Sequence, residues 1–301
     1  MTRERIRMSR PDKLASLPLK SIKINDRIWN HYIGLVKKEV IPYQWKALND
    51  KLENTEPSHS INNFRIAAGE ISGEFEGAVF QDTDVAKWLE AVAYSLETEP
   101  DAELEALADE TIDLIGRAQQ PDGYLDTYFI IKEPELKWTN LKEGHELYTA
   151  GHMIEAAVAY HQATGKDHFL HIVCRLADLI ADVFGDAYDK CHGYPGHEEI
   201  ELALIRLYYE NGNRKYLNLA KHFIDIRGVG ENYFIREERS RLFKPIWAKP
   251  GELDPAYFQS HMPVREQKTA EGHAVRATYL YCAMADLAYE FRDKALMDAC
   301  R

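Results

Sequence analysis

The chain has 301 residues, of which 45% are hydrophobic and 29% are charged, the composition of an ordinary globular protein with a sizeable core. Its 37 Lys and Arg residues and 49 Asp and Glu residues give a net charge of -12, and no basic cluster offsets this charge. This balance argues against a nucleic-acid partner or an anionic membrane surface, and no apolar run reaches the roughly 20 residues of a membrane-spanning helix.

The N-terminal segment and the cysteines both favour a cytoplasmic location. Residues 1–18 are basic but contain no apolar stretch and no small-residue cleavage site, so we expect a disordered leader and no secretory signal. The cysteines form no C-x-x-C motif and are predicted to be free thiols: Cys174, Cys191, Cys282 and Cys300. Cys191 and His192 are candidate metal ligands, but no second ligand pair accompanies them.

Hydrophobic periodicity predicts that most of the chain is helical. In chain order the predicted helices cover residues 29–51 (interrupted at Pro42), 84–97, 102–119, 146–164, 167–184, 198–210, 213–227, 274–291 and 294–301. Asp84 is the expected N-cap of the second of these helices. Strand-like patterns are confined to short stretches at residues 19–24 and 233–236.

The helices after residue 84 pair into hairpins with a common plan. The first helix of a pair is apolar on most of its surface, as at residues 153–161 and 201–209, whereas the second is amphipathic, as at residues 214–228. A helix that is apolar all round is buried, and one with a single apolar stripe packs outside it. The pattern therefore predicts an all-α fold, either a closed α/α barrel or an open array of helical repeats.

The same dipeptide precedes three of the predicted inner helices: Gly144-His145, Gly196-His197 and Gly272-His273. If inner helices run parallel, these three histidines converge on one rim. Glycine permits a sharp turn into the helix, and the helix dipole favours neutral imidazoles, which both donate and accept hydrogen bonds. We therefore predict a shared site for sugar hydroxyls. The alternatives are ordinary helix caps and a three-histidine zinc site.

Long connections at residues 120–145, 185–197 and 228–272 are rich in Gly, Pro and aromatic residues and are expected to wall a pocket at this rim. Several carboxylates lie nearby, and spacing alone selects no catalytic pair among them: Asp126, Glu146, Glu198, Glu199, Glu201, Glu266 and Glu271. Most of them are expected to be helix caps or hydrogen-bond partners.

At these residues the sequence resembles glycoside hydrolase family 127, over residues 19–301. The resemblance is carried by FQDTDVAKWLEAVAYSL, QQPDGYLDTYF, HELYTAGHMIEAAVAYHQATG, GYPGHEEIELALIRLYYENGNRKYL and PVREQKTAEGHAVRATYLY. It implies a catalytic (α/α)6 barrel, with His145, His197 and His273 binding the hydroxyls of arabinofuranose. It also implies retaining hydrolysis of terminal β-L-arabinofuranosides, with a small carbohydrate as the partner.

The resemblance is incomplete. About nine helices are predicted, whereas the barrel has twelve. The family's acid/base Glu and its nucleophilic Cys, held by zinc with further Cys and Glu ligands, are implied to lie beyond Arg301. The catalytic residues are therefore unknown in this chain, and no zinc is expected to bind to it. We expect the chain alone to be inactive, and the alternative reading is a non-catalytic sugar-binding or structural fragment. Exposed inner helices would promote self-association.

Overall fold

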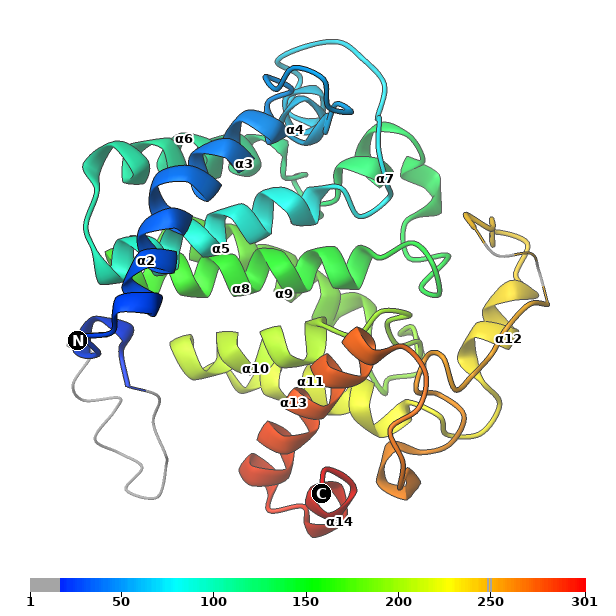
Figure 1. Ribbon diagram of the computed structural model, residues 1–301. Coiled ribbons are helices and arrows are strands. Elements are labelled where there is room, and N and C mark those ends of the chain that lie inside the picture. Colours follow the sequence, from blue (N-terminus) through cyan, green and yellow to red (C-terminus); the bar gives the residue numbers. More distant parts are fainter. Residues whose placement is uncertain (1–16, 248, 250) are drawn as a thin grey trace.

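The computed structural model describes residues 17–247, 249 and 251–301. Nearly all of the leader predicted at residues 1–18 therefore lies outside the described residues. The fold consists of helices in two layers (Figure 1). No described helix is both long enough and apolar enough to cross a membrane.

The inner layer is a row of helices packed side by side. In order they are α3 (Ile41–Leu48), α5 (Asp82–Thr98), α8 (Glu146–Thr164), α10 (Ile200–Asn211) and α13 (Ala274–Phe291). The N-terminal ends of α5, α8, α10 and α13 point toward the same side of the molecule, on the right in Figure 1. The last two residues before α8 and α13 are Gly-His pairs, so this side is the predicted rim.

The outer layer consists of α6 (Ala102–Ala118), α9 (His168–Val183), α11 (Arg214–Ile226) and the short α14 (Lys294–Ala299). The inner helix α8 buries 15 of its 19 residues, whereas its outer partner α9 buries 7 of 16. This difference confirms the predicted alternation of inner and outer helices. The pairing corresponds to part of an (α/α)6 barrel.

At the predicted turns, glycines end two inner helices and an asparagine begins the next outer helix. Gly165 ends α8 with φ 81°, and Gly212 ends α10 with φ 77°, a left-handed conformation that glycine adopts without steric cost. One residue later, the Asn213 side chain accepts a hydrogen bond of 3.1 Å from the backbone N–H of Lys215 and caps α11. These local signals fix the hairpin boundaries. The predicted cap Asp84 is wrong, because α5 already begins at Asp82.

The predicted interruption at Pro42 takes the form of a π-helical turn. Helix α2 (Arg27–Leu35) continues into the π-helical segment η2 (Val36–Val40) and then into α3. Pro42 is the second residue of α3, where a missing N–H costs little. Trp45 of α3 stacks on Trp88 of α5 with ring centroids 4.5 Å apart, which anchors α3 to the inner layer.

Both strand predictions are wrong. Residues 19–24 contain the 3-10 turn η1 (Leu19–Ser21), and residues 233–236 lie in helix α12 (Tyr233–Glu238). The Asn232 side chain accepts a hydrogen bond of 3.0 Å from Phe234 N–H and starts this helix, and four alternating residues are too few to specify a strand. The described part of the chain contains no β-strand, and its isolated bridge joins Phe184 and Cys191.

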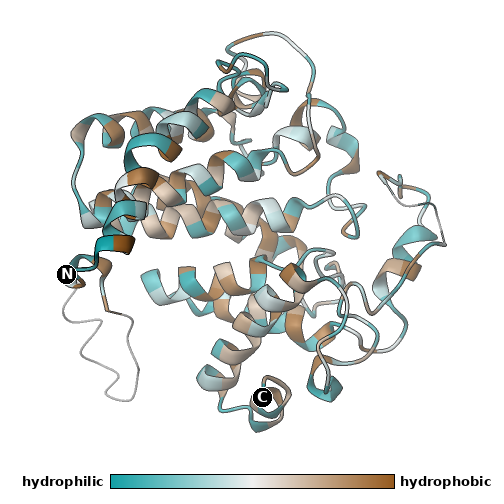
Figure 2. Ribbon diagram, viewed as in Figure 1, coloured by the Kyte–Doolittle hydropathy of each residue, from teal (hydrophilic) through white to brown (hydrophobic). Residues whose placement is uncertain are grey.

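The long connections gather at the rim (Figure 1). They contain short helices that the sequence did not predict, with α7 (Thr127–Ile131) and the 3-10 turn η3 (Pro134–Leu136) before α8, and η4 (Val264–Glu266) before α13. Helix α4 (Ser60–Ala67) was also not predicted and packs on α6 and α7. Figure 2 shows hydrophobic residues concentrated along the helices, including exposed ones on α2.

Candidate functional site

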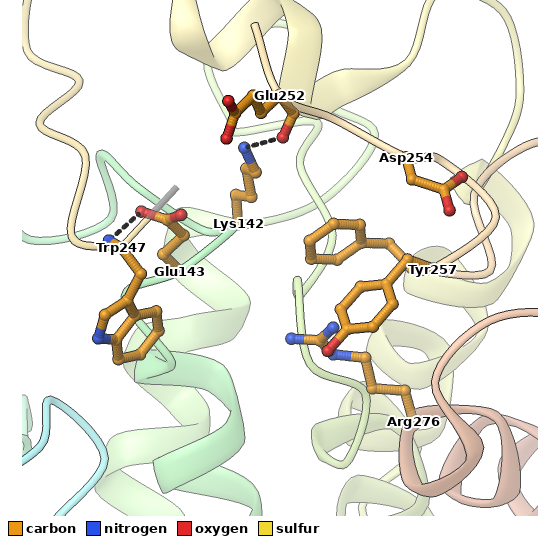
Figure 3. A pocket seen from close by; sticks show the side chains of 8 residues that line it. Lys142, Glu143, Trp247, Glu252, Asp254, Tyr257 and Arg276 are labelled. Carbon is orange, nitrogen blue, oxygen red and sulfur yellow. Dashed lines mark hydrogen bonds between the residues drawn. The ribbon is translucent and has the colours of Figure 1, made fainter. Parts of the chain in front are cut away.

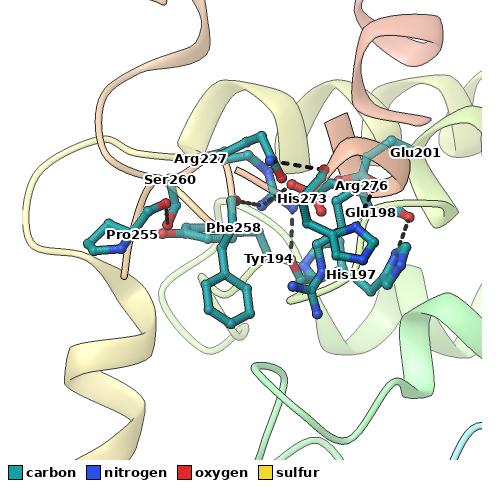
Figure 4. A network of polar contacts seen from close by, with 12 residues as sticks. Tyr194, His197, Glu198, Glu201, Arg227, Pro255, Phe258, Ser260, His273 and Arg276 are labelled. Carbon is teal, nitrogen blue, oxygen red and sulfur yellow. Dashed lines mark hydrogen bonds and ion pairs between the residues drawn. The ribbon is translucent and has the colours of Figure 1, made fainter. Parts of the chain in front are cut away.

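The three histidines of the Gly-His pairs lie together at the rim. The ring centroids of His145 and His197 are 5.7 Å apart, and those of His197 and His273 are also 5.7 Å apart. The predicted convergence is therefore confirmed. His197 occupies the middle of the row, and Figure 4 shows it beside His273.

The glycine in each pair is required by close packing. A Cβ atom on any of these three glycines would lie less than 3.0 Å from a backbone carbonyl oxygen, that of Asn140 for Gly144, of Lys142 for Gly196 and of Ala256 for Gly272. Only Gly272, with φ 74°, adopts the left-handed backbone that the predicted sharp turn implies. Gly196 thus lets its segment pack against the connection before α8, whereas Gly144 and Gly272 permit close approaches within their own connections.

The histidines meet their helices in different ways. His145 directly precedes α8 with a left-handed φ of 57°, and His273 caps α13 through a 3.3 Å hydrogen bond from Arg276 N–H to its Nδ1. Helix α10 begins at Ile200 rather than at the predicted residue 198, so His197 lies three residues before it. Despite these differences the imidazoles share one side of the inner layer.

Hydrogen bonds to the backbone define which ring nitrogens are available. His145 Nδ1 lies 2.6 Å from the carbonyl oxygen of Glu143, and His197 Nδ1 lies 2.9 Å from that of Glu198. Because a carbonyl oxygen only accepts, each Nδ1 donates, and in the neutral ring Nε2 is then an acceptor. His273 is the opposite case, because its Nδ1 accepts from Arg276 N–H and leaves Nε2–H as a donor.

Burial keeps the three rings neutral. It lowers the pKa of His145 to about 4 and the pKa of His197 to about 3. The pKa of His273 is also lowered, again mainly by burial and then by the nearby charge of Arg276. Burial, rather than the helix dipole, is thus the main cause of the predicted neutral state. The site offers two acceptors and one donor at neutral pH.

A tyrosine and a lysine of the inner layer extend the site. The Tyr148 ring lies 4.3 Å from the His197 ring, and its hydroxyl lies 3.2 Å from Lys87 Nζ on α5. Burial lowers the pKa of Lys87, while the charges of Asp84 and Glu199 oppose this shift. Two neighbouring inner helices, α5 and α8, therefore contribute polar groups next to the histidines.

Two carboxylates, one within residues 120–145 and one at the start of α8, have structural partners. Asp126 accepts from Phe129 N–H at 3.3 Å and caps α7, as expected for a carboxylate at this rim. Glu146 accepts from the Tyr124 hydroxyl and, at 2.8 Å, from Trp138 N–H. Burial raises the pKa of Glu146 to about 8. These groups hold residues 120–145 against the start of α8.

Arg227 forms a fully buried ion cluster beside the segment that carries His197 (Figure 4). Its guanidinium lies 2.8 Å from Glu198 and 3.2 Å from Glu201. It also donates to the carbonyl oxygens of Pro195 at 2.8 Å and Phe258 at 3.0 Å. The cluster connects the segment that carries His197 to the connection that precedes His273.

A cavity of about 390 Å³ opens beside the histidines (Figure 3). Its lining comes from the segments before α8 and before α13 and from the start of α13: Lys142, Glu143, Trp247, Glu252, Asp254, Tyr257, Phe258 and Arg276. The sequence predicted a pocket walled by these connections but did not single out Trp247, Tyr257 or Arg276. The richness of residues 228–272 in aromatic groups was the only available signal.

The described residues do not fit a metal centre. No group of three or more His, Cys, Asp or Glu side chains within them is arranged to hold a metal ion. The four cysteines are free thiols, and Cys191 Sγ lies 3.5 Å from the Tyr233 hydroxyl. This geometry therefore supports neither the hypothesis of a zinc site formed by the three histidines nor that of a metal site at Cys191 and His192.

The chain is similar to known arabinofuranosidases over nearly its whole length. It is 42% identical to a non-reducing end β-L-arabinofuranosidase of Bifidobacterium longum subsp. longum, covering 93% of this chain and 45% of that protein. A crystal structure of a GH127 β-L-arabinofuranosidase from Geobacillus stearothermophilus T6 matches with a TM-score of 0.88 and 58% identity, covering 92% of this chain and 44% of that one. A GH127 β-arabinofuranosidase structure matches with a TM-score of 0.80 and 34% identity, covering 94% of this chain and 42% of that chain.

The chain thus spans less than half the length of these relatives. The model of the β-L-arabinofuranosidase GH127 catalytic domain matches residues 21–301, which include all three histidines. The chain therefore belongs to glycoside hydrolase family 127.

Proposed function

We propose that the full-length protein containing this chain is a glycoside hydrolase that releases terminal β-L-arabinofuranose with retention of configuration. Family membership and the named activities of two relatives support this proposal. The observation that carries it is the group of three neutral imidazoles at 5.7 Å spacings at one end of the inner helices. Their fixed mixture of acceptors and a donor suits neighbouring hydroxyls of one sugar ring.

In this proposal the histidines bind and orient the sugar. Nε2 of His145 and Nε2 of His197 each accept a hydrogen bond from a hydroxyl, and Nε2–H of His273 donates to a hydroxyl oxygen. Since their backbone partners fix the rings, little side-chain entropy is lost on binding. The mixture of roles discriminates against ligands whose hydroxyls cannot supply both kinds of partner.

The described residues supply no thiolate and no zinc site beside the histidines, so we derive no bond-breaking step from them. We propose that the acid/base Glu, the nucleophilic Cys and any zinc belong to the remainder of a full-length protein. The relatives, of which this chain spans 45% and 44%, support that division. The 301-residue chain then acts alone as a sugar-binding fragment.

Hydrolysis of an aryl β-L-arabinofuranoside by the full-length protein tests this function. We expect release of the aryl group from the β-L-arabinofuranoside and not from the matched α-L-arabinofuranoside, because the histidines bind one arrangement of ring and leaving group. Product release is followed by absorbance, and proton NMR identifies the first-formed anomer. Cleavage of another glycoside in place of the β-L-arabinofuranoside would contradict the proposed substrate, and cleavage by the 301-residue chain alone would contradict the proposed division of labour.

We also propose that the 301-residue chain self-associates through the exposed apolar face formed by α2, η2 and the start of α3. The side chains of this face are between 39% and 64% exposed: Ile28, Trp29, Tyr32, Ile33, Val36, Val40 and Tyr43. An apolar patch of this length favours association in water.

Light scattering after size-exclusion chromatography, across a concentration series, measures the self-association. We expect a mass above that of the monomer, and we expect Trp29→Ser combined with Tyr32→Ser to return the mass to the monomer value. Tyr188→Ser is the control, since Tyr188 is fully exposed outside this face. A wild-type chain that is monomeric at every concentration would refute the proposal.

The free thiols support a cytoplasmic location for the protein as a further part of this proposal. All four cysteines are unpaired, and three of them, Cys174, Cys191 and Cys300, are partly buried, where burial raises the thiol pKa. Unpaired cysteines are typical of proteins in a reducing compartment.

A further inference from the structure

His145 takes part in the proposed sugar site from a strained backbone position. Its φ of 57° lies in the left-handed region, whereas neither His197 nor His273 has a positive φ. Trp138, earlier in the connection that leads to His145, has a left-handed φ of 62° as well. Non-glycine residues keep this conformation only where surrounding contacts enforce it. The end of the connection before α8 must therefore be held in place by its contacts.

Glu146 is joined to both strained residues. It directly follows His145 as the first residue of α8, and one of its carboxyl oxygens accepts from Trp138 N–H at 2.8 Å. Its other oxygen accepts from the Tyr124 hydroxyl, and the Tyr124 ring packs edge-on against the Trp138 ring with centroids 5.2 Å apart. The residue is only 3% exposed. One buried side chain thus ties the turn at Trp138 to the backbone of His145.

Glu146 belongs to a group of three buried carboxyls at the rim. The other two are Asp82, the first residue of α5, and Asp126, the N-cap of α7. Asp82 accepts from Thr127 N–H at 2.7 Å and from the Thr127 hydroxyl at 2.5 Å. Oδ2 of Asp126 has no hydrogen-bond partner among the described residues. The three carboxyls therefore join the starts of α5, α7 and α8 within one buried region.

The other charges around this group are mostly negative. Lys137, whose Nζ lies 4.3 Å from the centroid of the Tyr124 ring, favours the ionised form of Glu146. Glu237 on α12 and Asp84 on α5 add negative charge. Burial raises the pKa of all three carboxyls, that of Glu146 to about 8. Interacting buried carboxyls cannot all be ionised without strong repulsion, so this group retains at least one proton at neutral pH.

We propose that Glu146 is a positioning residue that holds His145 in its sugar-binding conformation, and that it does so as an uncharged carboxyl. The inference rests on the proposed function, in which His145 accepts from a sugar hydroxyl. In the uncharged form the carbonyl oxygen of Glu146 accepts from Trp138 N–H, and its O–H donates to the Tyr124 oxygen. Both contacts that fix the connection are kept, and no third charge is buried beside Asp82 and Asp126.

Loss of this proton weakens the hold on His145. The pKa of Glu146 in the folded chain lies above that of an unfolded glutamate, so the folded form binds the proton more tightly. The stabilisation from this proton is complete at acid pH and is lost as the pH rises through about 8. Sugar binding through His145 should therefore weaken above about pH 8, while the imidazole itself stays neutral.

The first test measures kcat/KM of the full-length protein for an aryl β-L-arabinofuranoside at about pH 7. We expect Glu146→Ala to lower it about tenfold or more, because Trp138 N–H and the Tyr124 hydroxyl lose their partner. Glu146→Gln should stay within about threefold of the wild type, because an amide makes both contacts without a charge. Ile112→Ala, in the core beneath outer helix α6, controls for a general loss of stability. A loss in Glu146→Ala no larger than that in Ile112→Ala would overturn the proposal.

The ratio of kcat/KM for the wild type to kcat/KM for Glu146→Gln isolates the proton, because titrations that the two proteins share cancel. Glutamine has no proton to lose in this range. We expect the ratio to be constant between about pH 6 and pH 7 and to fall at least about threefold by about pH 9.5. A merely structural contact gives the same ratio at every pH, and that result would refute the uncharged carboxyl.

Nitrogen NMR of the His145 ring in the 301-residue chain tests the positioning without hydrolysis. We expect the wild type and Glu146→Gln to show the proton on Nδ1, as the hydrogen bond to the Glu143 carbonyl oxygen requires. Glu146→Ala should show the mixture of tautomers of a released ring. An unchanged His145 signal in Glu146→Ala would contradict the positioning role. Failure of the proposed function is a separate result, namely that the full-length wild type does not cleave the arabinofuranoside.

Discussion

Replacing Arg227 with methionine is expected to lower the free energy of unfolding by about 3–5 kcal/mol at about pH 8. Arg227 is completely buried and pairs with Glu198 and Glu201, which are also buried. Removing the guanidinium leaves two carboxylates without their counter-ion and two backbone carbonyls, at Pro195 and Phe258, without a donor. Chemical denaturation followed by circular dichroism measures this loss.

The loss should be smaller at lower pH. Burial raises the pKa of Glu198 to about 7, although Arg227 opposes the shift. Since the folded-state pKa lies above that of the unfolded chain, the folded state binds this proton more tightly, and protonation relieves the uncompensated charge in the variant. The difference in unfolding free energy between wild type and Arg227→Met should therefore shrink as the pH falls from about 8 to about 6.

Two matched variants separate charge from packing. Arg227→Lys keeps the charge but loses the fork that reaches both carboxylates and both carbonyls, so its loss should be intermediate. Adding Glu198→Gln to Arg227→Met should recover part of the stability, because it removes one unpaired charge. A loss below about 1 kcal/mol for Arg227→Met at about pH 8 would mean that the buried ion cluster does not form.

The longer helices were predictable because their periodicity and end signals agree. The prediction for α8 and that for α9 match the structure to within one residue at each end, where Gly165 separates two strongly apolar segments. Short helices α4, α7 and α12 escaped prediction since five to eight residues span barely two turns. Their positions depend on capping by residues such as Asp126 and Asn232 and on packing against the inner layer.

The candidate site was predictable only where the sequence repeats. Three Gly-His pairs predicted three helix starts, two of which are observed directly after the histidine, and the structure brings all three histidines together. Arg227 carries no comparable signal, because an arginine at the end of an amphipathic helix is usually solvated. Trp247 and Tyr257 lie in a long connection whose path depends on Glu143, which is distant in sequence, and on the close approach of Gly272 at the end of the same connection.

Replacing His197 with phenylalanine in the full-length protein is expected to lower kcat/KM for an aryl β-L-arabinofuranoside about 10- to 100-fold. Phenylalanine keeps the ring packed between the neighbouring rings of His145, Tyr148 and His273 but removes the acceptor Nε2. A buried hydroxyl of the substrate is then left without a partner, which costs about 1–3 kcal/mol. Initial rates across a range of substrate concentrations give the change.

His197→Gln is the matched control, because its amide retains a polar atom that can accept from the same hydroxyl. We expect its activity to lie between those of the wild type and His197→Phe. Loss of activity with an unchanged unfolding temperature identifies a binding defect rather than a folding defect. Wild-type kcat/KM in His197→Phe would remove His197 from the proposed sugar site.

The pH dependence of sugar binding distinguishes these histidines from ordinary ones. Because burial lowers the pKa of His145 to about 4 and that of His197 to about 3, both rings keep their acceptor nitrogens through the range in which an exposed histidine becomes charged. Protonation would turn Nε2 of each ring from an acceptor into a donor and would place like charges beside Arg276. L-Arabinose binding to the 301-residue chain should therefore stay constant from about pH 8 to about pH 5 and weaken only below that.

Nitrogen NMR of the imidazole rings, recorded during the same titration, reports the charge of each histidine directly. We expect the signals of His145 and His197 to remain those of neutral rings with a proton on Nδ1 down to about pH 5, and the signal of His273 to show its proton on Nε2. The exposed His192 serves as an internal reference within the same chain. Binding that falls with a midpoint near pH 6.5, in step with protonation of His197, would contradict the neutral, buried site, because the acceptors would then be lost where an ordinary imidazole titrates.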